Sequence, residues 1–250
     1  MRGVVGVVLL VGLLLPACQG RGDRAEPSSR PTNGASSPTP AVDTPSPTPS
    51  ASGDPAQAAA RCTLVLGFSV TRNWFEDGAF ETLPGIEDSE WELIYEAGYD
   101  VWLYADPSGT PYSLPAVSPC DDEPDRVVFQ VAARGWQHRS NDELLAAIRS
   151  TIANIQATWP TVEVVELIPI VGGPDAAPCE AASQPGRPVD ASLMNPAMTA
   201  AISQVVDGGA VVAGPDPLLA DCSQYADGLG HISVDGSRHV ASVLADHYGT

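Results

Sequence analysis

The sequence predicts an α/β fold in which a five-stranded parallel sheet is covered by helices on both faces. Two observations predict it. Short apolar segments typical of buried strands alternate, along residues 61–250, with longer segments of helical periodicity. Strands that alternate with helices are joined by crossovers, which makes the sheet parallel and places helices on both faces. Residues 61–250 are also enough for one domain with its own core.

The first part of this region is expected to contain three strands and one helix. Residues 63–68 are apolar nearly throughout and predict the first, buried strand. Residues 86–97 predict a helix, because large apolar side chains recur three and four positions apart and Gly98 can end it. Residues 99–104 and 126–132 predict the second and third strands.

The clearest helix is expected after Ser140. Ser140 and Glu143 have the spacing of a capping box, and apolar side chains line one face of the following segment until Pro160 stops it. Residues 162–170 then predict the fourth strand.

Two helices around a short strand are expected in the last part. Asn195 and Pro196 are expected to open a helix that Gly208 ends. Residues 210–213 predict the fifth strand. Residues 234–248 predict the final helix, because their apolar side chains fall on one face.

Five strands of this kind favour a flavodoxin-like order, 2-1-3-4-5, in which the first and third strands are neighbours. If residues 61–250 lie in an oxidising compartment, their four cysteines indicate two disulfides, with three possible pairings. Cys62 and Cys120 precede the first and third strands at the same edge of the sheet. Cys179 and Cys222 lie in the long loops that leave the fourth and fifth strands. The pairs Cys62–Cys120 and Cys179–Cys222 are therefore favoured.

Metal binding is the alternative use of these cysteines, but their spacings match no zinc pattern. No glycine-rich phosphate-binding loop follows the first strand, which argues against a flavodoxin-like cofactor site. We expect neither a metal nor a cofactor.

The N-terminus is typical of an export signal. Arg2 is followed by an apolar run at residues 4–15, which is too short for a bilayer span of about 20 residues. Leu-Pro-Ala-Cys at residues 15–18 resembles the lipobox of bacterial lipoproteins, with Pro16 as a departure from it. Residues 1–17 are therefore expected to be a signal peptide, cut before a lipidated Cys18. The alternative is an ordinary signal peptide with a cysteine nearby by chance.

Residues 18–60 are expected to form a disordered linker. They are rich in Pro, Ser, Thr, Ala and Gly and hold almost no large apolar side chain, so they cannot bury enough surface to offset the entropy of ordering. The expected location is extracytoplasmic, with the domain held to the cell membrane through the lipid alone.

The charge of residues 61–250 limits the classes of partner that the domain can bind. This region holds 27 acidic and 8 basic residues, a net charge of −19. Nucleic acid and anionic surfaces are poor partners for such a charge. We expect a monomer that meets a small ester or a glycan of the cell envelope.

Polar residues collect at the positions where open α/β sheets place their functional groups, the carboxyl ends of the strands. Ser69 directly follows the first predicted strand, residues 133–138 follow the third, and residues 227–231 precede the last helix. Each also has an ordinary interpretation: a serine that caps a turn, an Asp-Gly turn dipeptide, and a surface histidine.

This ordering resembles the SGNH, or GDSL-type, hydrolase family, whose members cleave or transfer acyl groups, mostly of esters. Gly67 and Ser69 match the family's first block, Gly-Asp-Ser, with Phe68 in place of the aspartate. Asp227 and His231 match its last block, Asp-x-x-His, with one extra residue between them.

The resemblance covers most of residues 61–250 but not every block. The family's Gly-x-Asn-Asp block, which normally follows the third strand, is absent, and Ala-Arg-Gly-Trp stands at residues 133–136. The third predicted strand itself resembles that of the family.

The resemblance implies a Ser-His-Asp site. A serine hydroxyl is a weak nucleophile, so a base must take its proton and a carboxylate must orient that base. Ser69 is expected to attack, His231 to act as base, and Asp227 to orient His231.

The resemblance also implies donors for an oxyanion. The family uses the serine amide, a glycine amide after the second strand, and the asparagine after the third. The corresponding candidates here are Ser69, Gly109 and, in place of the asparagine, Arg134, with Gln137 and His138 as alternatives to Arg134.

Two functions follow. The first is a cell-surface serine ester hydrolase that acts on envelope esters, such as acetyl groups of a polysaccharide or lipid. The second is a non-catalytic protein of the same fold that binds glycan or another envelope component. The departures at Phe68 and at residues 134–136 favour the second function.

Overall fold

The computed structural model describes residues 60–112, 120, 123–174, 178–181, 185–206 and 209–249, all within the unit that runs from Ala51 to Thr250. The expected signal peptide, the expected lipidation site Cys18 and all but the last residue of the expected linker lie outside the described residues. The expected C-cap Gly208 lies outside them as well.

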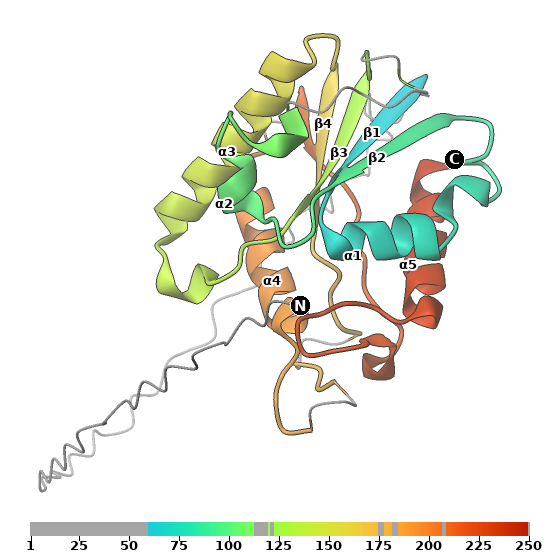
Figure 1. Cartoon of the computed structure of the whole chain (residues 1–250), viewed down its shortest axis with the longest axis vertical. Helices are drawn as coiled ribbons and strands as arrows, with labels where there is room; N and C mark the ends of the chain where they lie inside the picture. The colour runs from blue at the N-terminus through green and yellow to red at the C-terminus, as the bar shows by residue number, and fades with distance from the viewer. Residues whose placement is uncertain are drawn as a thin grey trace, which may run out of the picture. The chain divides into compact units, whose positions relative to one another are not determined.

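The sheet has five parallel strands in the order β2-β1-β3-β4-β5 (Figure 1). Their bounds are β1 Cys62–Gly67, β2 Glu90–Tyr95, β3 Arg126–Val131, β4 Val164–Pro169 and β5 Val211–Ala213. The predicted α/β fold and strand order are confirmed. All six residues of β1 and of β3 are buried, as expected for the centre of a sheet that is covered on both faces.

The helices form two layers (Figure 1). Helices α2, α3 and α4 cover one face, and α1 and α5 cover the other. Their bounds are α1 Ser69–Arg72, which continues as a π-helical turn at Asn73–Asp77, α2 Val101–Tyr104, α3 Asn141–Thr158, α4 Asp190–Ile202 and α5 Val234–Tyr248. The α5 bounds agree with the prediction. Ser140 caps α3 as expected, because its hydroxyl accepts the Glu143 N–H at 3.2 Å while the Glu143 carboxylate accepts the Ser140 N–H at 2.8 Å.

The prediction for residues 86–104 is wrong in both elements. The expected helix at 86–97 contains strand β2, and the expected strand at 99–104 contains helix α2. Apolar residues three and four apart also occur in a short strand that is buried on both sides, so periodicity alone does not separate the two. The decisive local signal is Asp100, whose carboxylate accepts the Trp102 N–H at 3.1 Å and caps α2.

The start predicted for α4 is wrong by five residues, because the helix begins at Asp190 and holds Pro196 in its interior. A proline inside a helix removes one backbone hydrogen bond, which is why a sequence pattern favours it at the first turn instead.

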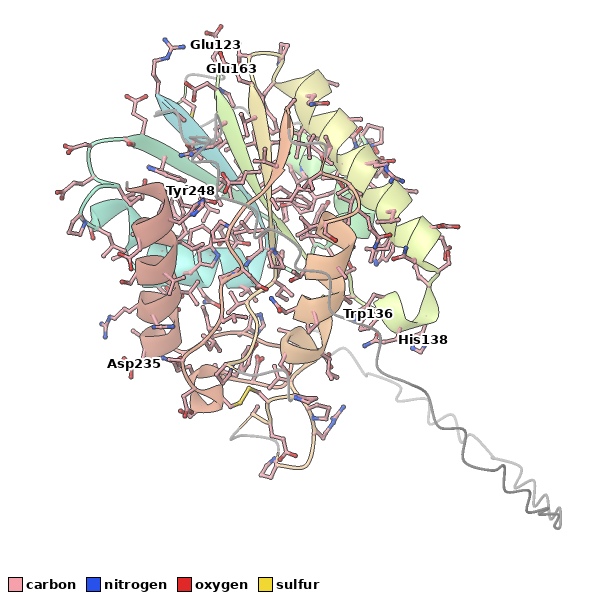
Figure 2. All side chains as sticks on the ribbon, turned by 180° about the vertical axis from the view of Figure 1, so that it is seen from behind. Glu123, Trp136, His138, Glu163, Asp235 and Tyr248 are labelled. Atoms are coloured by element: carbon pink, nitrogen blue, oxygen red, sulfur yellow. A yellow bond between two sulfur atoms is a disulfide. The ribbon has the colours of Figure 1, made fainter. Side chains whose placement is uncertain are left out.

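Both favoured disulfides are present, with Cα–Cα distances of 5.4 Å for Cys62–Cys120 and 5.3 Å for Cys179–Cys222. Cross-links that close loops of this length contribute about 4 kcal/mol each when they fit without distortion. Figure 2 shows Glu123 and Glu163, which precede β3 and β4, at one end of the sheet, and Trp136 and His138, which follow β3, toward the opposite end. No helix among the described residues is long and apolar enough to cross a membrane.

Candidate active site

Three side chains from distant parts of the chain form a continuous hydrogen-bonded row. Ser69 Oγ lies 2.8 Å from His231 Nε2, and His231 Nδ1 lies 2.6 Å from Asp227 Oδ2. An ionised carboxylate only accepts, so Nδ1 donates to Asp227. In the neutral ring Nε2 is then free to accept the Ser69 hydroxyl proton. The structure therefore brings together the three residues for which the resemblance to the SGNH family implied the roles of nucleophile, base and orienting acid.

Ser69 is held at the carboxyl end of β1 as the first residue of α1. The turn into the helix is tight: a Cβ on Gly67 would lie 1.9 Å from Thr71 Oγ1, so this position requires glycine. Thr71 is in turn fixed, because its hydroxyl donates to Gln130 Oε1 at 2.7 Å and accepts the Phe68 N–H at 3.0 Å. The Ser69 N–H is the first of α1, and the first N–H groups of a helix have no acceptor within the helix.

Asp227 and His231 sit on one closed loop before α5. Asp227 Oδ1 accepts the backbone N–H groups of Leu229, Gly230 and His231 at 2.9, 3.0 and 3.1 Å. Partial burial alone would raise the pKa of Asp227. The hydrogen bonds and charge of His231, with the backbone N–H groups, outweigh that effect and hold the pKa below its ordinary value. The carboxylate therefore stays ionised opposite the imidazole ring.

The start of α4 supports this loop from outside. The Asp190 N–H donates to the Gly228 carbonyl at 2.9 Å. Gly230 has a φ of +104°, and a Cβ there would lie 2.2 Å from Ala191 Cβ. The extra residue between Asp227 and His231, relative to the family block, is thus accommodated by a glycine packed against α4.

A cavity of about 230 Å³ opens beside the Ser69 hydroxyl and the His231 ring. Its buried floor is apolar and consists of Phe68, Val70, Ala132, Ile170 and Met194. Its exposed rim is largely polar and consists of Arg134, Gly135, Gln137, Asp190 and Leu229. Phe68, which stands where the family has an aspartate, is therefore part of the floor.

The predicted oxyanion donors are only partly gathered at this cavity. Ser69 and Arg134 both line it, and so does Gln137. Gly109 does not line it; its N–H donates to the Asp106 carbonyl at 3.0 Å in the turn after α2. Because the element before Gly109 is a helix and not the second strand, the reason for choosing that glycine does not hold. His138 does not line the cavity either.

Several cavity residues were not singled out from the sequence. Ile170 follows β4 directly, so its place at the carboxyl end of a strand could have indicated it. Asp190 and Met194 belong to the part of α4 that precedes the predicted start, and no local pattern indicated them. Among the described residues, no cluster of three or more His, Cys, Asp or Glu side chains could hold a metal ion.

Comparison with known proteins gives distant structural likenesses. No protein-family model matches the chain, and no curated protein matches it. A protein assigned as an SGNH hydrolase from Slackia heliotrinireducens is similar at 20% identity and a TM-score of 0.47, over 75% of this chain and 98% of that one. A carbohydrate esterase family 3 structure from Talaromyces cellulolyticus is similar at 16% identity and a TM-score of 0.46, over 74% and 95%.

A third likeness is to a structure from Streptococcus pneumonia assigned as a platelet activating factor, with 14% identity and a TM-score of 0.49, over 74% of this chain and 83% of that one. TM-scores below 0.5 do not establish an activity for this chain. The function therefore rests on the geometry of Ser69, His231 and Asp227.

Proposed function

We propose that this chain is a serine ester hydrolase whose nucleophile is Ser69. The observation that carries the proposal is the row from Ser69 Oγ through His231 to Asp227, with separations of 2.8 and 2.6 Å beside an open cavity. This arrangement matches the requirements of an activated serine: a base within hydrogen-bond reach and a carboxylate that fixes the base.

The reaction would proceed in two halves. Ser69 Oγ attacks the ester carbonyl carbon while His231 Nε2 takes the hydroxyl proton, and the imidazolium is stabilised by Asp227. The tetrahedral intermediate collapses to an acyl-serine, and the alcohol leaves with the proton from His231. Water then attacks the acyl-serine with His231 as base again. The acid is released and the Ser69 hydroxyl is restored.

The oxyanion would be stabilised by two groups. The Ser69 N–H is the first amide of α1 and has no acceptor within the helix, and Arg134 lines the rim of the same cavity. Arg134 lies in the segment that stands in place of the family's Gly-x-Asn-Asp block and would substitute for its asparagine. A charged donor would compensate for a neutral one there, because hydrogen bonds from ionised groups are roughly twice as strong.

The cavity favours a small acyl group on a polar alcohol. A floor of buried apolar side chains and a volume of about 230 Å³ suit a short alkyl chain, which gains by leaving water. The exposed rim offers Arg134, Gln137 and Asp190, which can hydrogen-bond to hydroxyl groups of the alcohol. Acetyl or other short-chain esters of an envelope polysaccharide or lipid fit a cavity with this apolar floor and polar rim.

The test is ester hydrolysis by the purified chain. The chain should release p-nitrophenol from p-nitrophenyl acetate, and Ser69→Ala should reduce kcat to the uncatalysed background. Ser203→Ala, at an exposed serine on α4's C-cap, is the matched control and should keep full activity. A well-folded Ser69→Ala variant with unchanged turnover would refute the proposal.

Glycan binding without catalysis is the second candidate. It is favoured by the polar rim and by the absence of the family's Gly-x-Asn-Asp block, where residues 133–136 are Ala-Arg-Gly-Trp. It predicts retention on envelope glycan that survives Ser69→Ala, together with no ester turnover by the unaltered chain. Turnover that depends on Ser69 would exclude it.

We further propose that lipid on Cys18 anchors the chain outside the cytoplasm. The two disulfides among the described residues agree with an oxidising compartment. Metabolic labelling with an alkyne fatty acid should mark the chain, and Cys18→Ser should abolish the mark and release the protein from membranes. Labelling that persists in Cys18→Ser would place the lipid elsewhere.

A further inference from the structure

The backbone N–H and carbonyl groups of Arg134 are both hydrogen-bonded to side chains of residues 100–102, the segment that follows β2. The Arg134 N–H donates to Asp100 Oδ2 at 3.2 Å, and the Arg134 carbonyl accepts the Trp102 indole N–H at 3.0 Å. Val101 lies between Asp100 and Trp102, and its N–H donates to the Ala132 carbonyl at 2.8 Å. No helix or strand contains Arg134, so these contacts replace regular secondary structure at this point.

The two side chains of this attachment are themselves fixed. Asp100 is only 6% exposed, and its other oxygen, Oδ1, accepts the Trp102 N–H at 3.1 Å as the cap of α2. The Arg139 guanidinium lies 4.6 Å from the centre of the Trp102 ring, and Arg139 Nη1 lies 3.9 Å from Glu143 Oε1 at the start of α3. Asp100 and Trp102 therefore each have a contact other than the one to Arg134: Asp100 with the Trp102 N–H, and the Trp102 ring with Arg139.

A helix cap alone would not need this arrangement. Capping uses one oxygen of Asp100, and a serine can perform it. The second oxygen accepts the backbone N–H of Arg134, an arginine that lines the cavity. Burial raises the pKa of Asp100, an unfavourable environment for a carboxylate whose only purpose is to cap a four-residue helix.

We propose that Asp100 and Trp102 are positioning residues that hold Arg134 at the cavity so that its guanidinium meets the oxyanion. The inference rests on the proposed esterase function. A fixed backbone at Arg134 restricts the positions that its long side chain can reach.

The variants separate positioning from capping. Asp100→Ser keeps a capping oxygen for α2 but is too short to reach the Arg134 N–H. Trp102→Phe keeps the aromatic ring under Arg139 and removes the indole N–H. Asp106→Ser is the matched control, because Asp106 accepts from Ser108 in the exposed turn after α2, away from the cavity.

Steady-state kinetics on p-nitrophenyl acetate, with the full chain, provide the test. Loss of an oxyanion donor typically costs about 10²–10³ in kcat, so Arg134→Ala should fall in that range. Asp100→Ser and Trp102→Phe should each lower kcat at least tenfold with KM within twofold. Asp100→Ser combined with Arg134→Ala should be no slower than Arg134→Ala alone, because both changes remove the same contribution.

Three results would overturn the inference: an unchanged kcat in Asp100→Ser, losses that multiply in the double variant, or an equal loss in Asp106→Ser. Melting temperatures must stay within a few degrees of the unaltered chain; a loss of kcat that follows only from unfolding also counts against it. Failure of the esterase proposal is distinguishable, because the unaltered chain would then show no Ser69-dependent turnover at all.

Discussion

The Asp227 carboxylate lies 2.6 Å from His231 Nδ1, and both side chains belong to a single loop closed on itself. The Ala226 N–H donates to the His231 carbonyl at 2.7 Å, and an antiparallel bridge joins Tyr225 to Ile232. The acid and the base are thus positioned by the same short piece of backbone. The support of this loop by α4 and its approach to Ser69 depend on the packing of distant parts of the chain.

Asp227→Asn should keep the shape of the loop but reverse the hydrogen bond to His231. An amide nitrogen facing Nδ1 favours the tautomer whose Nε2 carries the proton, which cannot accept from Ser69. We expect kcat to fall by about 10⁴, as in serine proteases altered in this way. Asp235→Asn, at an exposed carboxylate in the first turn of α5, is the control and should leave kcat unchanged. A loss below tenfold in Asp227→Asn would show that the carboxylate does not orient the ring.

The lowered pKa of Asp227 predicts how its contribution to stability depends on pH. Because the folded chain favours the ionised carboxylate, the contribution is full above the unfolded pKa of about 3.9. It is lost as the pH falls through the lower folded value. The difference in melting temperature between the unaltered chain and Asp227→Asn should therefore be constant near neutrality and shrink below about pH 4. A difference that grows on acidification would contradict this sign.

Met194→Ala should widen the acyl preference. Met194 is buried in the cavity floor, where its sulfur accepts the Ala133 N–H at 3.1 Å, and its removal leaves space for a longer chain. Since a methylene in an apolar pocket changes kcat/KM by about 10-fold or more, the ratio for p-nitrophenyl octanoate over acetate should rise at least tenfold. Leu229→Ala, at the exposed rim, should leave that ratio unaltered. Equal ratios in both variants would remove Met194 from the acyl site.

Gly230→Ala should damage both stability and activity. Its φ of +104° is unfavourable for any side chain, and the new Cβ would lie 2.2 Å from Ala191 Cβ. Gly186→Ala is the matched control, because Gly186 has a φ of +81° with open space around it. Thermal unfolding should show the larger loss for Gly230→Ala, and only that variant should lose kcat. Equal losses of stability in Gly230→Ala and Gly186→Ala would mean that the positive φ, and not the contact with Ala191, causes the loss at Gly230.

The two disulfides should differ in their effect on activity. Cys179–Cys222 ties the loop after β4 to the segment just before the Asp227–His231 loop, whereas Cys62–Cys120 lies at the opposite edge of the sheet. Removing either pair should cost about 2–5 kcal/mol of unfolding free energy in denaturant titrations. Only the Cys179→Ala/Cys222→Ala variant should also lose kcat at a temperature where it remains folded. A loss of kcat in both double variants would point to a general loosening.

Much of the fold could be predicted from sequence because its signals are local. Ser140 and Glu143 mark the start of α3, and continuous apolar runs mark β1 and β3. The prediction for the region of β2 and α2 failed because its apolar spacing fits both a strand and a helix. The local signal that distinguishes the two is the capping contact of Asp100. The start of α4 was predicted too late because a proline is usual in the first turn of a helix, whereas Pro196 lies in the interior of α4.

The candidate site divides in the same way. Ser69, Asp227 and His231 could be singled out because each has a fixed place relative to a strand or helix end. Gly109 was chosen only because a strand was expected before it, so that choice failed together with the strand. Met194 faces the cavity through the tertiary placement of α4, which no local spacing encodes.

The most direct measurement of the central claim is mass spectrometry of the purified chain after reaction with a fluorophosphonate. Such a probe reacts with an activated serine and leaves ordinary serines untouched. The account predicts one adduct per chain, located on the peptide that contains Ser69 and absent from Asp227→Asn and His231→Ala. A folded chain without an adduct, or an adduct on another serine, would contradict it.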